Sequence, residues 1–372
     1  MKKNISRRLG LAAIVIPTLV LALAYPLGMR LGLTTAAADD ITLSTTGTPF
    51  GVSGGNVNDI SSAFCCSGTL GSLVKDSTGL LLILSNNHVL ARSDAASPGE
   101  VISQPGLVDN LCQTPPPVAT LTAFPTLGSN VDAAIAELTS NSPMATDGSI
   151  NGIGTISSNP KKPAIGLGVQ KSGRTTGTTS GTVQSFNTNV KVQYQARCGQ
   201  GKKFTVSYTN QVVVTPGAFS AGGDSGSLIL TSDSKKQPVA LLFAGSSTTT
   251  IGNPICDVLA KVSSSNSNKT ISFVGDSTLG TDECAGTASG STPPPPGPSR
   301  GHQRANAAKE RYADQLMSRP GVMGIGIGNT EDNKDSAVIL YLDSTAQGPP
   351  FVPAQLDGVP VRVVRTDTFV SR

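Results

Sequence analysis

A serine and a histidine stand in sequence contexts suited to nucleophilic catalysis. Ser225 lies in Gly-Gly-Asp-Ser-Gly-Ser, where the glycines allow a tight turn whose amide hydrogens can converge on one point. A serine hydroxyl needs a neighbouring base to take its proton, and histidine has a suitable pKa. His88 follows an apolar run typical of a rigid strand. The other of the two histidines, His302, adjoins a proline-rich stretch, so His88 is the predicted base.

A buried carboxylate would orient the imidazole and stabilise its protonated form. Asp132 is the best candidate, because small and apolar residues surround it in Asn-Val-Asp-Ala-Ala-Ile-Ala and a carboxylate withdrawn from water needs a partner. Asp94 and Asp109 also lie between His88 and Ser225, but in polar, loop-like contexts. We therefore predict a catalytic triad of His88, Asp132 and Ser225.

The order of these three residues resembles that of the chymotrypsin-like serine peptidases and differs from subtilisin-like and α/β-hydrolase orders. The stretch Lys-Ser-Gly-Arg-Thr-Thr-Gly-Thr-Thr-Ser-Gly-Thr-Val at 171–183 resembles the start of the second barrel in bacterial streptogrisins. There, cysteines often stand where this chain has Lys171 and Ser180. Ser-Asn-Asn-His-Val, followed by Ile-Ser-Gln-Pro-Gly at 102–106, resembles a bacterial trypsin-like branch that is similar to the plant narrow-leaf proteins. The resemblance spans about residues 60–265.

The resemblance implies an all-β, chymotrypsin-like double barrel, to which this chain adds a small C-terminal α+β module. It implies an endopeptidase that cleaves proteins or peptides through an acyl-enzyme, with the amides of Gly223 and Ser225 as the oxyanion hole. In related peptidases the aspartate at the position of Asp224 receives a freed N-terminus or another internal partner.

The substrate-binding residues also follow from the resemblance. It places the base of the pocket for the residue before the scissile bond at Phe219. No carboxylate stands there to hold a Lys or Arg side chain, so a small or apolar residue is expected. The edge strand that pairs with substrate backbone would contain Phe243, Ala244, Gly245 and Ser246.

Composition favours a glycine-rich β protein. The chain has 372 residues, 41 of them glycine, with 14% charged residues, as expected for short strands joined by turns. The formal net charge of +4 arises from basic residues near the start of the chain: Lys2, Lys3, Arg7, Arg8 and Arg30. Nucleic-acid partners are excluded, because their binding needs clustered Lys and Arg.

Residues 1–38 are predicted to be an export signal. Basic residues precede an apolar run from Leu9 to Leu27, and the alanines at 36–38 offer a cleavage site. An uncleaved membrane anchor is the alternative, because a run of about 19 residues nearly spans a bilayer. In either case we expect the rest of the chain outside the cytoplasm: secreted, periplasmic or at the cell surface.

Six cysteines agree with an oxidising compartment: Cys65, Cys66, Cys112, Cys198, Cys256 and Cys284. Six cysteines allow 15 pairings, among which the sequence does not choose. The adjacent Cys65 and Cys66 are expected to have different partners, because a bridge between neighbours is strained. A metal site is disfavoured, since the chain has no C-x2-C pair and few histidines, and no cofactor is expected.

Four prolines in a row mark the clearest domain boundary, because they favour an extended spacer. Beyond them, one helical and about three strand-like stretches predict the α+β module. The expected organisation is a signal or anchor at 1–38, a polar lead-in at 39–60, the peptidase domain at 61–284, a linker at 285–303 and the module at 304–372.

Two other functions compete with peptide hydrolysis. The first is a non-catalytic peptide-binding protein on a peptidase scaffold, regulated by the C-terminal module; Ser225→Ala separates binding from hydrolysis. An intramolecular contact of the module with the peptidase domain would serve inhibition, with Arg300 as a site for its release, and recruitment of substrate or surface attachment are its other conceivable roles. The second, a lipase or esterase, is disfavoured by the chain order and by the lack of Gly-x-Ser-x-Gly around Ser225.

Overall fold

The computed structural model describes residues 47–285, 299–345 and 352–372. The predicted signal at 1–38 lies outside these residues, as does most of the predicted linker. Residues Leu43–Arg372 form one compact unit.

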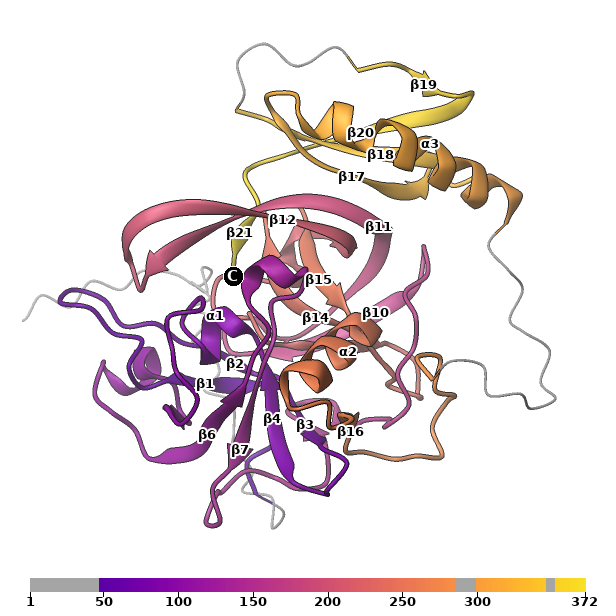
Figure 1. The fold of residues 1–372 in the computed structure, drawn as a ribbon. Helices are drawn as coiled ribbons and strands as arrows, with labels where there is room; N and C mark the ends of the chain where they lie inside the picture. Colours follow the sequence, from indigo (N-terminus) through magenta and orange to yellow (C-terminus); the bar gives the residue numbers. More distant parts are fainter. Residues whose placement is uncertain (1–46, 286–298, 346–351) are drawn as a thin grey trace, which may run out of the picture. The chain divides into compact units, whose positions relative to one another are not determined.

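Short strands of the first half pair into an eight-stranded sheet, ordered β16-β3-β4-β7-β6-β5-β1-β2. Apolar runs such as that of β4 are buried in its core, which explains why they form strands rather than surface loops. The strands, drawn from indigo to magenta in Figure 1 except for the last, are β1 (Val52–Asn56), β2 (Gly68–Leu70), β3 (Ser72–Lys75), β4 (Leu81–Ser85), β5 (Val101–Ser103), β6 (Pro117–Ala123), β7 (Ala134–Leu138) and β16 (Ser272–Phe273).

The expectation of a polar lead-in at 39–60 is corrected by β1, which lies inside that range. Val52, Ser53 and Gly54 pair with β2, and Phe50 is fully buried just before them. The burial of one large aromatic ring, together with backbone pairing, makes this segment part of the barrel although its composition is polar and glycine-rich.

Strands of the second half form an eleven-stranded sheet in which β10 to β15 pair with one another and β17, β18, β20 and β19 follow. Two further strands, β8 (Ser149–Ile150) and β9 (Gly154–Thr155), form a separate pair. The sheet contains β10 (Gly168–Gly173), β11 (Gly177–Arg197), β12 (Gln200–Thr215), β13 (Leu228–Thr231), β14 (Pro238–Gly245), β15 (Thr250–Pro254), β17 (Val322–Asn329), β18 (Ser336–Asp343), β19 (Gln355–Leu356), β20 (Val359–Thr366) and β21 (Val370–Ser371).

The predicted fold class, an all-β double barrel with a small C-terminal α+β module, is confirmed. Two sheets with separate apolar cores account for the two barrels. The strands of the first sheet pair antiparallel, as do β10 to β15 of the second, whereas β18 with β20 and β11 with β21 form parallel pairs. In the C-terminal part, α3 (Arg300–Met317) buries one face against β17 and β18, with Ala305, Ala308 and Leu316 in the shared core (Figure 1).

The hairpin of β11 and β12 is longer than an ordinary strand pair, with 21 and 16 residues. Irregularities in its register, for example between Ser185 and Thr188, allow the long ribbon to bend. Its β11 strand also pairs with β17, in a register that sets Phe186 opposite Ile327. The turn at the hairpin tip contains Cys198.

Helices are few in the described ranges. Besides α3, these ranges contain α1 (Asn87–Leu90), α2 (Ile255–Ser265) and three 3-10 turns: η1 (Leu107–Asn110), η2 (Leu127–Ser129) and η3 (Gly217–Phe219). His302, assigned to the linker from the sequence, lies in the first turn of α3, because the Ser299 side chain accepts a hydrogen bond from its amide and caps the helix. Among the described residues, no helix has the length and apolarity to cross a membrane.

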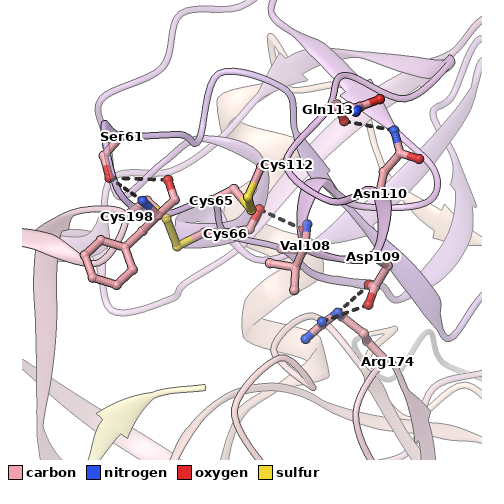
Figure 2. The surroundings of a disulfide bond; sticks show 12 residues. Ser61, Cys65, Cys66, Val108, Asp109, Asn110, Cys112, Gln113, Arg174 and Cys198 are labelled. Carbon is pink, nitrogen blue, oxygen red and sulfur yellow. Dashed lines mark hydrogen bonds and ion pairs between the residues drawn. A yellow bond between two sulfur atoms is a disulfide. The ribbon is translucent and has the colours of Figure 1, made fainter. Parts of the chain in front are cut away.

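All six cysteines form disulfides, in the pairs Cys65–Cys112, Cys66–Cys198 and Cys256–Cys284. Cys65 and Cys66 have different partners, as predicted. Figure 2 shows Cys65–Cys112 and Cys66–Cys198 side by side, with the ion pair of Arg174 and Asp109 nearby. Cys65–Cys112 lies within the first barrel, and Cys66–Cys198 ties the tip of the β11–β12 hairpin to that barrel.

Removal of Cys66–Cys198 by a double change to serine should destabilise the fold more than removal of Cys256–Cys284. The bridged residues are 132 and 28 positions apart, and a longer closed loop restricts the unfolded chain more. Even with Cys65–Cys112 shortening the first loop, the difference should be about 1 kcal/mol. Denaturant unfolding of both double variants measures it, and equal losses would contradict the prediction.

Candidate functional site

His88 and Asp132 are brought together by the pairing of β4 with β7. The register sets Ser85, at the end of β4, opposite Ala134, at the start of β7. His88 follows β4 within α1, and Asp132 precedes β7 by two residues. Both residues therefore lie at the same end of these two neighbouring strands, as is needed for the predicted pair of a base and its carboxylate.

The two side chains form a close pair. Asp132 Oδ2 lies 2.6 Å from His88 Nδ1, and Asp132 Oδ1 accepts a hydrogen bond of 3.1 Å from the His88 amide. Asp132 is fully buried. Burial lowers the pKa of His88, but the charge and hydrogen bond of Asp132 outweigh it and raise the pKa above the usual 6.5. The carboxylate thus orients the ring and favours its protonated form.

Tyr194 is a second partner of Asp132 that the sequence analysis missed. Its hydroxyl donates a 2.9 Å hydrogen bond to Asp132 Oδ2 and lies 2.7 Å from the hydroxyl of Tyr208. Burial, with the nearby charge of Asp132, raises the pKa of Tyr194 well above its usual value, so the phenol stays a donor. Tyr194 lies on β11 and Tyr208 on β12. Only the folding of the hairpin over the first barrel brings them to the carboxylate.

Ser225 lies in the turn between η3 and β13, where the local backbone demands glycine. Gly223 and Gly226 have φ of 98° and 93°, and a Cβ on Gly226 would lie 2.2 Å from the Thr69 carbonyl oxygen. The Ser225 hydroxyl donates a 3.4 Å hydrogen bond to the Phe243 carbonyl. In the described part of the chain, no hydrogen bond joins Ser225 to His88. His88 Nε2 instead lies 3.3 Å from the main-chain oxygen of Arg372.

Asp224 anchors the turn that carries Ser225. Its carboxylate accepts hydrogen bonds from the amides of Thr175, Thr176 and Ala221, and Lys171 Nζ lies 3.5 Å away. Lys171 and Asp224 are both fully buried, and burial lowers the pKa of Lys171 while the charge of Asp224 opposes this shift. Lys171, which stands where streptogrisins often have cysteine, is thus the internal cationic partner of Asp224.

The predicted substrate-binding residues lie along one strand and one turn. Phe243, Ala244 and Gly245 form the end of β14, and Ser246 follows directly. Phe219 is 1% exposed in η3 and packs into the core of the second barrel. The guanidinium of Arg372 lies near η3, where it donates hydrogen bonds to the backbone carbonyls of Ser220 and Ser246.

A cavity of about 220 Å³ adjoins His88 on the side of the disulfides, lined also by Asp59, Cys66, Arg92, Cys198 and Arg372. Burial raises the pKa of Asp59 to about 6, against the lowering effect of His88 and Arg92. In the described ranges, no group of three or more metal-ligating side chains comes together.

Comparisons with known proteins complete the description. No protein-family model and no curated protein matches the sequence. The structure is similar to a glutamic acid specific serine protease, with 22% identity and a TM-score of 0.41 over 60% of this chain and 98% of the other. Thermobifida fusca protease A has 20% sequence identity and a TM-score of 0.40, over 61% of this chain and 98% of the other. Nocardiopsis protease has 18% identity and a TM-score of 0.40, over 57% of this chain and 95% of the other.

Asp132→Asn should lower the pKa of His88 below 6.5, because the opposing burial remains when the carboxylate charge is lost. The chain has only two histidines, so an NMR titration of the imidazole signals resolves both. His302 serves as the internal control and should not shift. An unchanged His88 pKa in the variant would refute the role of Asp132.

Proposed function

We propose that this protein is a serine endopeptidase, exported from the cytoplasm, that hydrolyses peptide bonds through His88, Asp132 and Ser225. The observation that carries the proposal is the hydrogen bond of 2.6 Å between the fully buried carboxylate of Asp132 and the ring of His88. A buried carboxylate that holds one ring nitrogen leaves the other nitrogen, Nε2, to act as a base. The glycine turn with Ser225 then supplies a nucleophile in the same region.

The oxyanion hole is supported by two free amides. Within the described residues, the amides of Gly223 and Ser225 have no hydrogen-bond acceptor. Unpaired amides in a rigid turn can stabilise the negative charge that develops on a substrate carbonyl oxygen. The left-handed backbone of Gly223 and the anchoring of Asp224 keep this turn in place.

The mechanism follows from these positions. The Ser225 hydroxyl leaves the Phe243 carbonyl, gives its proton to His88 Nε2 and attacks the substrate carbonyl carbon. His88 then protonates the leaving amine, which departs and leaves an acyl group on Ser225. Water, deprotonated by His88, attacks this ester. The bond from the acyl carbon to Ser225 Oγ then breaks, Oγ takes the proton back from His88, and the carboxylic acid product leaves. Asp132 stabilises the imidazolium in both halves of the reaction.

Export is proposed from the disulfides together with the N-terminal sequence. Three disulfides that include every cysteine favour an oxidising compartment. Residues 1–38 have the pattern of a signal or anchor. We therefore propose a secreted, periplasmic or cell-surface location.

A non-catalytic peptide-binding protein is the second candidate function. It is favoured by one observation, namely that the Ser225 hydroxyl bonds to the Phe243 carbonyl rather than to His88. Rotation of the Ser225 side chain about χ1 would turn its hydroxyl from the Phe243 carbonyl toward His88, and the barrier to such a rotation is small. The labelling experiment below separates the two functions.

Labelling with a fluorophosphonate probe tests for an activated serine. The parent chain should react at Ser225, whereas Ser225→Ala should not react and His88→Ala should react about 10⁶-fold more slowly. Gel fluorescence and mass spectrometry of the labelled peptide measure this. A parent protein that is folded and unreactive in every form, including the shortened chain described below, would favour the peptide-binding function.

Tyr194→Phe should reduce kcat/KM about tenfold, because a hydrogen bond to a charged group contributes about 1.5 kcal/mol or more. Tyr208→Phe is the matched control, since it leaves the bond from Tyr194 to Asp132 in place. The two variants remove the same atom from neighbouring rings. If both lose the same activity, Tyr194 does not position Asp132.

A further inference from the structure

The last strand of the chain, β21, lies along β14. Ser371 is paired with Ala244 and Val370 with Gly245, in antiparallel orientation. Val370 is also paired with Gln193 of β11, in parallel orientation. β21 is therefore enclosed between β14 and β11. The end of β14 is the strand edge that we expect to pair with substrate.

Arg372 continues this pairing up to the predicted reaction centre. Its amide donates a 3.1 Å hydrogen bond to the Phe243 carbonyl, and its main-chain oxygen lies 3.3 Å from His88 Nε2. The same Phe243 carbonyl accepts from the Ser225 hydroxyl. Arg372 thus stands where the residue before a scissile bond would have to stand for Ser225 to attack its carbonyl.

The Arg372 side chain fills the space beside Gly245. Nη1 donates a 3.1 Å hydrogen bond to the Ser220 carbonyl, and Nη2 donates to the Ser246 carbonyl. A Cβ on Gly245 would lie 2.6 Å from Arg372 Nε, so glycine is needed for this side chain to enter. The guanidinium therefore occupies a pocket built of backbone carbonyls and one glycine.

The fit is incomplete. Arg372 Nε is buried without a hydrogen-bond partner, and among the described residues no carboxylate forms an ion pair with the guanidinium. Burial lowers the pKa of Arg372, although the charges of Asp367 and Asp224 oppose this. A half-buried cation that donates hydrogen bonds only to carbonyls and forms no ion pair is weakly stabilised, so this occupant should be displaceable.

The residues before β21 are held more firmly. Phe369 is fully buried, and its ring packs edge-on against that of Tyr341, with 5.9 Å between the ring centroids. The Phe369 carbonyl accepts a 2.9 Å hydrogen bond from the Gln193 amide. Asp367 accepts hydrogen bonds from the amide and hydroxyl of Ser247. Anchoring at Phe369 and Asp367 keeps the following three residues at a high local concentration beside the site.

We propose that residues 370–372 are an intramolecular ligand of the substrate-binding cleft, bound in the orientation of a substrate with Arg372 in the pocket for the residue before the scissile bond. This inference rests on the proposed function for the identity of the cleft. The bound segment blocks access to Ser225 and His88, so the enzyme is inhibited until a substrate or partner displaces it. The pocket accepts an arginine through carbonyl oxygens rather than through a carboxylate.

Removal of the ligand tests the inhibition. A chain shortened after Phe369, which keeps that buried anchor, and the full-length variant Arg372→Glu, which sets a negative charge against two carbonyls, should both react with the fluorophosphonate at least tenfold faster than the parent. Arg365→Glu is the matched control, because Arg365 is exposed on β20, and should react like the parent. Equal rates for a reactive parent, the shortened chain and Arg372→Glu would overturn the proposal.

A binding measurement tests the occupancy without catalysis. In the Ser225→Ala background, acetyl-Val-Ser-Arg should bind to the shortened chain and not to the full-length chain, as measured by NMR at peptide concentrations up to several millimolar, because a tethered segment reaches an effective concentration of about millimolar. Equal binding to both chains, or binding to neither, would overturn the proposal. If the probe labels no form, the proposed peptidase function fails, and this binding measurement still decides whether the cleft holds residues 370–372.

Discussion

The hydrogen bond between Asp132 and His88 is the interaction on which the site depends. Asp132 is fully buried, and a carboxylate without partners in such a place would be strongly destabilising. It has three donors: the ring and amide of His88 and the hydroxyl of Tyr194. These bonds join the start of β7, the end of β4 and the long hairpin. The carboxylate that raises the pKa of His88 therefore also ties the first barrel to β11.

The hairpin of β11 and β12 connects the site to the rest of the molecule. Through Tyr194 it contacts the carboxylate, through Cys198 it is bridged to Cys66 of the first barrel, and through Gln193 it pairs with Val370. A ribbon of this length would be poorly held by its own two strands. The disulfide and the pairing of β11 with β17 supply the missing constraint. A displacement of the hairpin would therefore disturb both the hydrogen bond to Asp132 and the pairing with β21.

The edge at the end of β14, which β21 covers, is the second constraint. The end of β14 offers backbone groups that must bind water, substrate or another strand. A peptidase needs this edge to be open for substrate, whereas an open edge also invites unwanted pairing. The pairing of β21 with Ala244 and Gly245 covers the edge. The unpartnered Nε of Arg372 makes this cover weaker than an ideal ligand, which is consistent with a reversible device.

Residue types and their order determined part of this protein. The glycines around Ser225, the apolar run before His88 and the small residues around Asp132 mark local environments that a sequence displays directly. Strand-like runs between turns predicted a β-rich chain, because alternation and turn chemistry act over a few residues. The double barrel was implied by the resemblance to chymotrypsin-like peptidases, which rests on the order of His88, Asp132 and Ser225. The same local signals failed for β1, since only burial of Phe50 makes a strand of a polar, glycine-rich segment.

Tertiary structure alone decided which distant groups meet. Six cysteines permit many pairings, and only the placement of the hairpin tip selects Cys66–Cys198. Nothing near Tyr194 or Lys171 in the sequence points to Asp132 or Asp224, because these contacts span 62 and 53 positions. The contact of Arg372 with His88, across 284 positions, is longer still. Such pairings depend on how whole strands pack, a property that no short stretch of sequence contains.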